Sequence, residues 1–469
     1  MVAASIILAL IAGTVFAPRQ VMYKGRSFRR VIEMSGPQEI EQAVSELGIE
    51  ATLPDLIHAL KDNDSFIKKI ELKVWPALPR SFKSKHLEWM PMPADSTRSK
   101  VHSALIYIGP QAEATIPILI RQARKMPFPQ NGSILAAISE AGRNSPAAFE
   151  YLMEAARDPD ERVRSLAALD LSYFTSCADA IVPLLTSNML AATSAPLNEM
   201  HALSMLGTNA APAAPVVIRF LNENGKPGNW LTALRHAGPG ASVAVPALTR
   251  LAASNNPLAI EALMNIGPGA REALPVLSNI VANNVGLTRS LAVAAIARVT
   301  ENPSSAIPDL IDGLQGRWGK RGSEPNWSSP WNDSRLMSIG LNRRETAAWL
   351  LGEFGPAGHD AVPALSDALE ERNAGWLSLF AARALWLIES NSTLVLPRLM
   401  RTLETKNTQE IQIAVRILGE IGPQAAPAEP ILRTLRTNEW SRTGSAWVIR
   451  REINNALRRI HNSQERAPK

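Results

Sequence analysis

Apolar side chains recur at spacings of three and four along most of the chain, which is the periodicity of an α-helix with one buried face. In the segment ALMNIGPGAREALPVLSNIV this pattern runs up to Ile266, stops, and resumes at Leu274. Gly267 suits the left-handed position that ends a helix, and Pro268 cannot continue one. Pro275 is tolerated only near the start of the next helix, where a missing N–H costs little. The pattern therefore predicts one helix, a tight turn and a second helix running back.

The same two-helix segment recurs along the chain. Its second helix carries an early proline, and the successive prolines from Pro183 to Pro308 are about 29–33 residues apart, within the range of helical repeat arrays. The step from Pro308 to Pro363 is about 55 residues, so roughly 20 residues are inserted there. Each unit would pack on its neighbours and need no single large core. The copies begin at Ala43, Ala104, Ala202, Ala233, Ala262, Ala347 and Ala414.

The turns between the paired helices carry glycines and prolines to which we assign a structural role. They repeat because every helix pair needs the same turn, so we do not interpret them as phosphate-binding loops. These residues are Gly109, Pro110, Gly207, Gly238, Pro239, Gly267, Pro268, Gly355, Pro356, Gly422 and Pro423.

Two groups of segments resemble known families. DPDERVRSLAALDL, together with the recurring LGxxGPxAxxAxPxL, resembles HEAT repeats of the short bacterial type, which also occur in phycobilisome-lyase-like HEAT proteins. The resemblance extends from Glu41 to His461 and implies about ten repeats. MYKGRSFRRVIE and AVSELG…LPDLIHALKDNDSFIKKIELKVWPALP resemble a group of bacterial membrane-anchored HEAT-repeat proteins of unassigned function. The resemblance implies a right-handed, all-α solenoid of the armadillo type that binds other macromolecules.

The N-terminal residues need a separate interpretation. MVAASIILALIAGTVFAP has no charged side chain from Val2 to Pro18, and about 17 apolar residues are the lower limit for a membrane-spanning helix. A signal peptide's apolar region and a buried helix that caps the solenoid are the alternatives. Pro18 would follow a cleavage after Ala17 and should block it. We therefore expect a single-pass anchor over 1–18 and a basic juxtamembrane linker over 19–40. Basic residues follow the apolar run, which places the body in the cytoplasm, or in the periplasm if the start codon is wrong.

Composition supports a folded body and limits its partners. The chain has 469 residues, of which 46% are apolar, enough for a continuous core over 41–462; we expect 463–469 to be disordered. The net charge is +6, with 49 basic and 43 acidic residues, so the body is nearly balanced. Basic residues alternate with tryptophans between Lys73 and Lys100, but a solvated face explains them better than a nucleic-acid site. Cys177 is the only cysteine, which excludes an internal disulfide.

The insertion, which we place at 315–340, is the main local anomaly. Insertions in repeat arrays map to loops on one face, often the binding face, and Trp and Arg are enriched at interface hot spots. The alternative is that its tryptophans pin the loop onto its own solenoid. Trp349, Trp376 and Trp386 stand at helical positions, so we assign them to the core. The candidate partner-binding residues are Arg317, Trp318, Lys320, Arg321, Trp327 and Trp331.

No residue set indicates catalysis or a cofactor. The sequence has no HExxH, CxxC, GxxxxGK or GxSxG motif. HEAT-like iron hydroxylases use His-Glu pairs, and none of the seven histidines is followed by Glu. His236 precedes a repeat turn, where we expect it to interact with the helix C-terminus. We predict no catalytic, metal-binding or cofactor-binding residues.

The sequence therefore predicts a non-enzymatic, membrane-tethered scaffold or adaptor that binds a protein partner. The alternatives are a HEAT-like chromophore lyase, or a lyase-like accessory subunit, supported only by the shared repeat type, and a nucleic-acid-binding HEAT protein.

Overall fold

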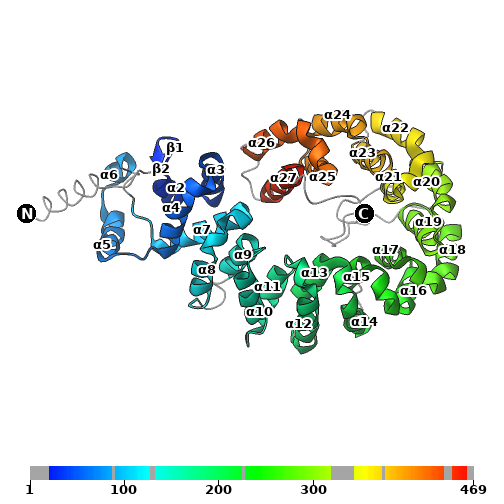
Figure 1. Cartoon of the computed structure of the whole chain (residues 1–469), viewed down its shortest axis with the longest axis horizontal. Coiled ribbons are helices and arrows are strands. Elements are labelled where there is room, and N and C mark those ends of the chain that lie inside the picture. Colours follow the sequence, from blue (N-terminus) through cyan, green and yellow to red (C-terminus); the bar gives the residue numbers. More distant parts are fainter. Residues whose placement is uncertain are drawn as a thin grey trace, which may run out of the picture. The chain divides into compact units, whose positions relative to one another are not determined.

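The computed structural model describes residues 21–86, 90–126, 132–223, 228–317, 343–371, 375–437 and 446–461. This part of the chain is almost entirely helical, with one short β-hairpin, which confirms the all-α prediction. The helices group into two compact units, Met1–Phe174 and Thr175–Lys469, which we call unit 1 and unit 2 (Figure 1).

Unit 1 begins with a hairpin and short helices before the paired helices start. Its elements are β1 (Met22–Tyr23), β2 (Arg26–Ser27), α2 (Phe28–Met34), α3 (Pro37–Leu47), α4 (Ile49–Lys61), α5 (Phe66–Val74), η1 (Trp75–Ala77), α6 (Arg80–Lys85), α7 (Ala94–Ile108), η3 (Gly109–Thr115), α8 (Ile116–Ala123), α9 (Gly132–Ala141), α10 (Pro146–Ala155) and α11 (Glu161–Leu171).

Residues 21–40 belong to the segment expected to be a basic linker, and they are folded. The antiparallel strands β1 and β2 pair Met22 with Ser27 and Tyr23 with Arg26. Phe28, Val31 and Ile32 on α2 are buried, because this helix packs on α3 and α4. Lys24 and Arg26 therefore lie in the hairpin, and Arg29 and Arg30 lie on a helix with an apolar buried face.

Unit 2 is a stack of antiparallel helix pairs. Its elements are η4 (Thr175–Cys177), α12 (Ala178–Ala191), α13 (Leu197–Leu206), η5 (Gly207–Ala213), α14 (Ala214–Glu223), α15 (Gly228–Ala237), η6 (Gly238–Ala244), α16 (Val245–Ala253), α17 (Pro257–Ile266), η7 (Gly267–Ala273), α18 (Leu274–Asn283), α19 (Leu287–Val299), η8 (Pro303–Ser305), α20 (Ile307–Leu314), α21 (Arg343–Glu353), η10 (Gly355–Ala361), α22 (Val362–Glu370), α23 (Trp376–Glu389), α24 (Ser392–Leu403), α25 (Thr408–Ile421), η11 (Gly422–Ala428), α26 (Glu429–Thr437) and α27 (Ala446–His461).

The odd-numbered helices from α13 to α27 pack on one another in succession. Figure 1 shows them on the inner side of the curve of unit 2, with the even-numbered helices α12 to α26 on the outer side. Each helix buries its apolar face against its own partner and the next pair, which is the arrangement of a helical solenoid.

The turn glycines adopt the positive φ that the sequence predicts. Gly267 has φ +68° and ψ −133°, and η7, a 3₁₀ segment of 7 residues with a kink at Ala270, leads into α18. This ψ lies outside the left-handed helical well that we expected, in a region that essentially only glycine adopts. The glycines that start η3, η5, η6, η10 and η11 also have positive φ.

The prolines of the second helices lie largely where we predicted. Pro246 and Pro275 occupy the second residue of α16 and α18, where the missing N–H breaks no helical hydrogen bond. The prediction is wrong for Pro183 and Pro397, which lie inside α12 and α24, because these helices begin five residues before the proline.

One described stretch, Ala94–Ala123, is long and apolar enough to cross a membrane by length and composition. It consists of α7, η3 and α8, the two helices and the turn of one repeat, with a kink at Ala112. Since α7 packs on α3, α4 and α9, this stretch is a core element of unit 1. The expected anchor at 1–18 and the expected tail at 463–469 lie outside the described residues, and their boundaries stay predictions.

Candidate partner-binding surface

Arg317 is the predicted partner-binding residue that falls within the described part of the chain. Its N–H donates to the main-chain oxygen of Asp312 at 2.8 Å, and its Nε donates to Asp312 Oδ1 at 2.8 Å. These bonds hold Arg317 on the last turn of α20, although its side chain is 56% exposed. Trp318, Lys320, Arg321, Trp327 and Trp331 lie outside the described residues.

The two ends of the insertion are held together by Arg344, at the start of α21. Arg344 Nε donates to the main-chain oxygen of Leu314, the last residue of α20, at 2.7 Å. Its two Nη atoms bind both oxygens of Glu371, at the end of α22, at 3.0 and 2.6 Å. The hydrogen bond from Arg344 lowers the pKa of the Glu371 carboxyl. Arg344 therefore joins the end of α20, the start of α21 and the end of α22.

Charged side chains of alternating sign cross-link four neighbouring inner helices, and we call Arg298, Glu353, Arg383 and Glu420 the inner charge ladder. Arg298 Nη2 on α19 donates to the main-chain oxygen of Glu353 on α21 at 2.8 Å. Arg383 on α23 binds Glu353 through Nη1 at 3.0 Å and Glu420 on α25 through Nε at 2.7 Å. A further pair, Arg416 Nη2 with Glu452 Oε1 at 2.9 Å, joins α25 to α27.

Arg383, in the middle of the inner charge ladder, is buried, and this strengthens its pairing with Glu353 and Glu420. Its side chain is 13% exposed, and burial alone would lower the pKa of its guanidinium. Glu420 and Glu353 outweigh that effect and raise the pKa above its ordinary value. Because two carboxylates share one buried guanidinium, charged atoms of α21, α23 and α25 are held in a fixed geometry.

The tryptophans assigned to the core from the sequence are only half-buried. Trp349, Trp376 and Trp386 all keep part of their surface exposed. The Arg383 guanidinium carbon lies 5.8 Å from the centre of the Trp349 ring, within the range of a cation–π contact. The core assignment was wrong because helical periodicity does not distinguish a buried face from the partly open inner face of a stack.

A second polar cluster joins α13, α15 and α17. His236 Nδ1 lies 2.7 Å from Ser204 Oγ, and His236 Nε2 lies 2.9 Å from Arg235 Nη2. An arginine can only donate, so Nε2 accepts and the ring proton is assigned to Nδ1, which donates to Ser204. The imidazole therefore offers Ser204 no lone pair with which to activate its hydroxyl. His236 therefore contacts Ser204 on α13 and its neighbour Arg235 on α15, two contacts that the sequence did not predict. The expected interaction with the helix C-terminus stays a prediction.

Sequence reasoning missed the inner charge ladder. One signal for it was present, because Glu353 and Glu420 occupy the same place in LGEFGP and LGEIGP. Arg383 stands in a repeat without that motif, so its pairing could not be read from the sequence. Among the described residues, no group of three or more His, Cys, Asp or Glu side chains is placed to hold a metal ion.

No protein-family model matches the sequence. A search of curated proteins returns no match. Among solved structures, the chain is similar to the karyopherin Kap121p bound to the SUMO protease Ulp1p, at 13% identity and a TM-score of 0.45, over 92% of this chain and 53% of that chain. It is similar to importin beta at 12% identity and a TM-score of 0.41, over 90% and 64% of the two chains. A structure on the cadherin–β-catenin interaction matches at 10% identity and a TM-score of 0.34, over 93% and 99%. The chain thus spans about half the length of the Kap121p chains, 52% in another complex. At these identities and TM-scores, the partners of those proteins say nothing about the partner of this one.

Proposed function

We propose that the protein is a non-enzymatic, membrane-tethered scaffold that presents the inner face of unit 2 and the insertion to a protein partner. One observation carries the proposal: α21 begins at the end of the insertion and also carries Trp349, whose ring lies against the Arg383 guanidinium of α23. Arg344 fixes the base of the insertion at the start of this helix, and Trp349 and Glu353 follow one to three turns later.

The chemistry of this region suits a protein partner. Tryptophan and arginine are the residue types that contribute most to binding energy at protein interfaces. The inner face of a helical solenoid is an extended binding surface in repeat proteins, because stacked repeats present equivalent positions side by side. The sequence has no nucleophile, metal or phosphate-loop motif that would favour catalysis.

The finer features of the proposal come from the sequence. We propose a right-handed superhelix of about ten repeats. We also propose that residues 1–18 anchor the chain in the membrane as a single span, with the body in the cytoplasm by the distribution of basic residues. Protease treatment of spheroplasts that express the full chain with a C-terminal tag tests this topology: protection of a membrane-bound tag supports it, and digestion or a soluble tag contradicts it.

Cross-linking in cells tests the binding surface. The full chain carries a C-terminal tag, and cross-linked partners are identified by mass spectrometry. We expect Trp327→Ala with Trp331→Ala to abolish capture of the partner while the melting temperature stays unchanged. Val243→Ala is the control, because Val243 is 56% exposed in η6, away from α20 and α21 in the chain. Equal capture by the double variant and the wild type would overturn the role of the insertion, and a lower melting temperature would show that its tryptophans pack on the solenoid instead.

A further inference from the structure

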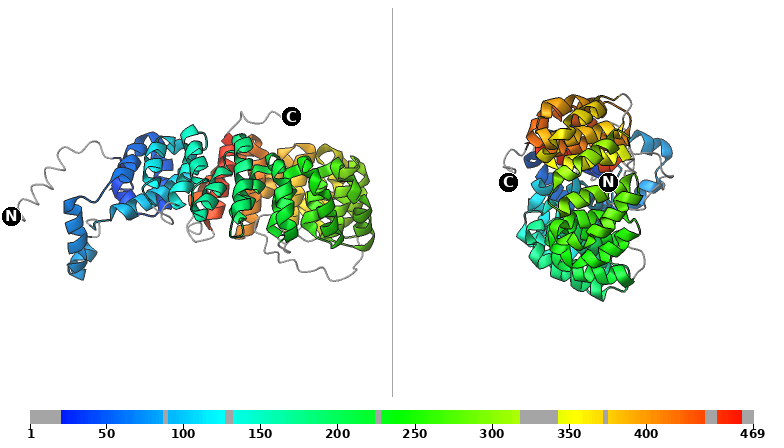
Figure 2. Two further views of the ribbon diagram at one scale, coloured as in Figure 1. Left: turned by 90° about the horizontal axis from the view of Figure 1, so that it is seen from below. Right: turned by 90° about the vertical axis from the view of Figure 1, so that its right-hand side faces the viewer.

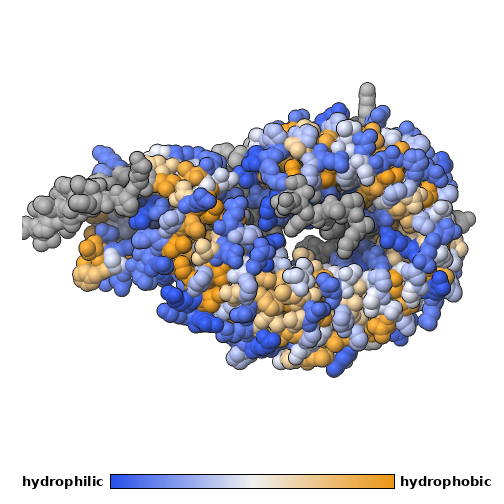
Figure 3. Space-filling view, viewed as in Figure 1, coloured by the Kyte–Doolittle hydropathy of each residue, from blue (hydrophilic) through white to orange (hydrophobic). Residues whose placement is uncertain are grey.

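The segment 66–85, which we call the α5–α6 hairpin, exposes large apolar side chains. None of the residues in α5, η1 and α6 is buried. Phe66 is 79% exposed, Ile67 68%, Ile70 46% and Val74 49%. In Figures 1 and 2 the hairpin lies at the edge of unit 1, and Figure 3 shows hydrophobic side chains gathered at that edge. Contiguous apolar surface of this kind marks an interaction site.

The apolar side chains share one face of α5. Positions 66, 67, 70 and 74 fall within an arc of about 100° on an α-helix. On the other side of the helix, Lys68 Nζ lies 2.9 Å from Asp62 Oδ2 and 3.8 Å from Asp64 Oδ1. Helix α5 therefore directs one charged side chain toward unit 1 and leaves its apolar face outward.

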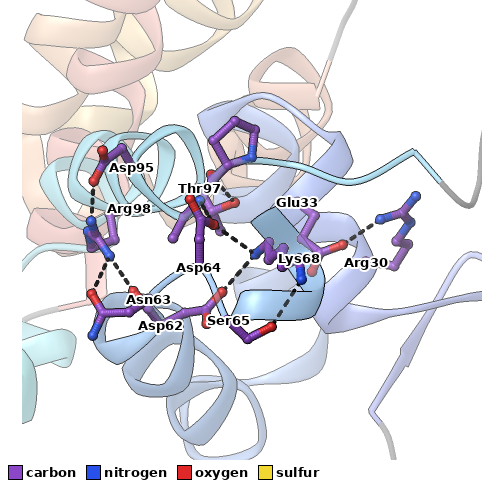
Figure 4. A network of polar contacts seen from close by, with 12 residues as sticks. Arg30, Glu33, Asp62, Asn63, Asp64, Ser65, Lys68, Asp95, Thr97 and Arg98 are labelled. Atoms are coloured by element: carbon purple, nitrogen blue, oxygen red, sulfur yellow. Dashed lines mark hydrogen bonds and ion pairs between the residues drawn. The ribbon is translucent and has the colours of Figure 1, made fainter. Parts of the chain in front are cut away.

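Polar contacts fix the base of the hairpin, as Figure 4 shows. Ser65 caps α5, since its hydroxyl accepts from Lys68 N at 3.2 Å. Asp64 Oδ1 accepts from Ala94 N at 2.8 Å, which joins the start of the hairpin to the start of α7. Arg98 on α7 also donates to the main-chain oxygen of Asp62. The hairpin leaves and re-enters unit 1 at one held point, so its outward face is a built feature.

The tip of the hairpin is closed by aromatic and polar contacts. The rings of Trp75 and Phe82 meet edge to face, with their centres 6.5 Å apart. Lys83 Nζ donates to the main-chain oxygen of Pro76 at 2.9 Å. These contacts join α6 to η1 at the end of α5, and Phe82 adds a side chain that is 37% exposed to the apolar surface.

Basic side chains surround this surface. The hairpin contains six basic residues and one acidic residue, Glu71. Four of these basic residues are exposed to solvent: Lys69, Lys73, Arg80 and Lys85. An apolar stripe rimmed by lysines is typical of a helix that lies in the interface of an anionic bilayer. Protein interfaces, in contrast, are depleted of lysine.

We propose that the α5–α6 hairpin lies in the headgroup region of an anionic lipid bilayer. Phe66, Ile67 and Ile70 enter the boundary between headgroups and acyl chains. Lys69 and Lys73 bind the anionic headgroups. This contact goes beyond the proposed scaffold function and is independent of an anchor at 1–18. It would set the orientation of unit 1 against the membrane, which a tether at one point does not.

A fluorescent probe at position 70 of the full chain tests the contact. The probe is a nitrobenzoxadiazole group on Ile70→Cys in a Cys177→Ser background, since Cys177 is the only native cysteine. We expect a blue-shifted, brighter emission with vesicles that contain phosphatidylglycerol and little change with phosphatidylcholine alone. Quenching by lipids spin-labelled near the headgroup should exceed quenching by lipids labelled deep in the acyl chain.

Two controls separate this contact from an anchor. A probe on Ser278→Cys, exposed on the outer helix α18, should not shift when the chain binds vesicles. Lys69→Gln with Lys73→Gln and Lys85→Gln should abolish the shift at position 70, because each of these lysines contributes about fivefold to partition onto anionic lipid. These side chains are exposed, so the melting temperature should stay unchanged.

The outcomes are distinguishable. A chain that floats with vesicles while the emission at position 70 stays as in buffer would overturn the hairpin contact and leave the tether of the proposed function standing. A chain that neither floats nor shifts would overturn both. An emission at position 70 that is already blue-shifted before vesicles are added would show that protein covers this face, from the same chain or a second copy, and would also overturn the proposal.

Discussion

Arg235 and Glu261 form an ion pair in the interior of unit 2, where their side chains are 1% and 8% exposed. Arg235 Nη1 on α15 lies 3.2 Å from Glu261 Oε2 on α17. Burial raises the pKa of the Glu261 carboxyl, and Arg235 offsets part of that rise. The pair joins two neighbouring repeats. Both charged groups are buried, so water could not replace either partner if the other were removed.

We expect Arg235→Met to destabilise unit 2 by about 3–5 kcal/mol near neutral pH, because it leaves a buried carboxylate without its cation. The loss of Arg235 raises the pKa of Glu261 further. A raised folded-state pKa means that stability is present at low pH and is lost as pH rises through that pKa, so the destabilisation should grow with pH. Urea unfolding of the full chain at several pH values checks this.

Glu261→Leu combined with Arg235→Met is the matched control. Replacing both charges by apolar side chains of similar volume removes the unpaired group, so the double variant should be more stable than Arg235→Met alone. A double variant as unstable as the single one would show that the guanidinium acts through other contacts.

We expect the stability of unit 1 to depend on pH through Asp170. Its carboxyl is buried on α11 and accepts from Ser139 Oγ at 3.0 Å. Burial raises its pKa to about 7, more than Ser139 lowers it. Because the folded-state pKa is raised, this group's stabilisation is complete below about pH 4 and is lost as pH rises toward 7, by at most about 4 kcal/mol.

Asp170→Asn should therefore raise the unfolding free energy at alkaline pH and change it little in acid. Thermal melts of both chains across this range measure the difference. If Asp170→Asn raised the stability equally at all pH values, the effect would not come from titration of Asp170.

Gly352→Ala tests how closely α21 and α23 approach. A Cβ at Gly352 would lie 2.8 Å from Ala384 Cα and 3.1 Å from Ala384 Cβ. Since the nearest atom is backbone, the helices must move apart, at a cost of roughly 1–3 kcal/mol. Gly132→Ala at the start of α9 is the control, because its Cβ would meet only Leu166 Cδ1 at 3.5 Å. Equal melting temperatures for the two variants would refute the close approach.

We expect substitutions at two helix ends, Gly267 and Ser390, to change the stability in opposite directions. Gly267→Ala should cost roughly 1–3 kcal/mol through backbone strain at this positive φ. A steric clash does not add to this cost, because the nearest atom lies 3.9 Å from the added Cβ. Gly267→Asn should not rescue it, because ψ is −133°, outside the left-handed helical well. Ser390 has φ +54° and ψ +22°, inside that well, so Ser390→Gly should stabilise by about 0.5–1 kcal/mol. Chemical denaturation of the three variants gives these differences. If Gly267→Asn restored the stability that Gly267→Ala loses, residue 267 would adopt the left-handed helical conformation, which would contradict this account.

The sequence alone determined the helix pairs and their turns, while the bounds of the insertion stay a prediction. Each of these depends on local chemistry: apolar periodicity sets a helix, and a glycine that alone tolerates the turn geometry, as at Gly267, ends it. These signals repeat, so each copy reinforced the others. The described helices end at Leu314 and resume at Arg343, on either side of the predicted insertion.

Only the tertiary structure decided which side chains meet across repeats. Arg383 lies between Glu353 and Glu420, 30 and 37 residues away in the chain, and periodicity does not say which face of a helix meets which neighbour. The same limit made Trp349 look like a core residue when it lies half-exposed under Arg383. The α5–α6 hairpin followed the helical pattern of its neighbours, and only its packing showed that its apolar face stays uncovered, because burial depends on what lies opposite a helix and not on the helix itself.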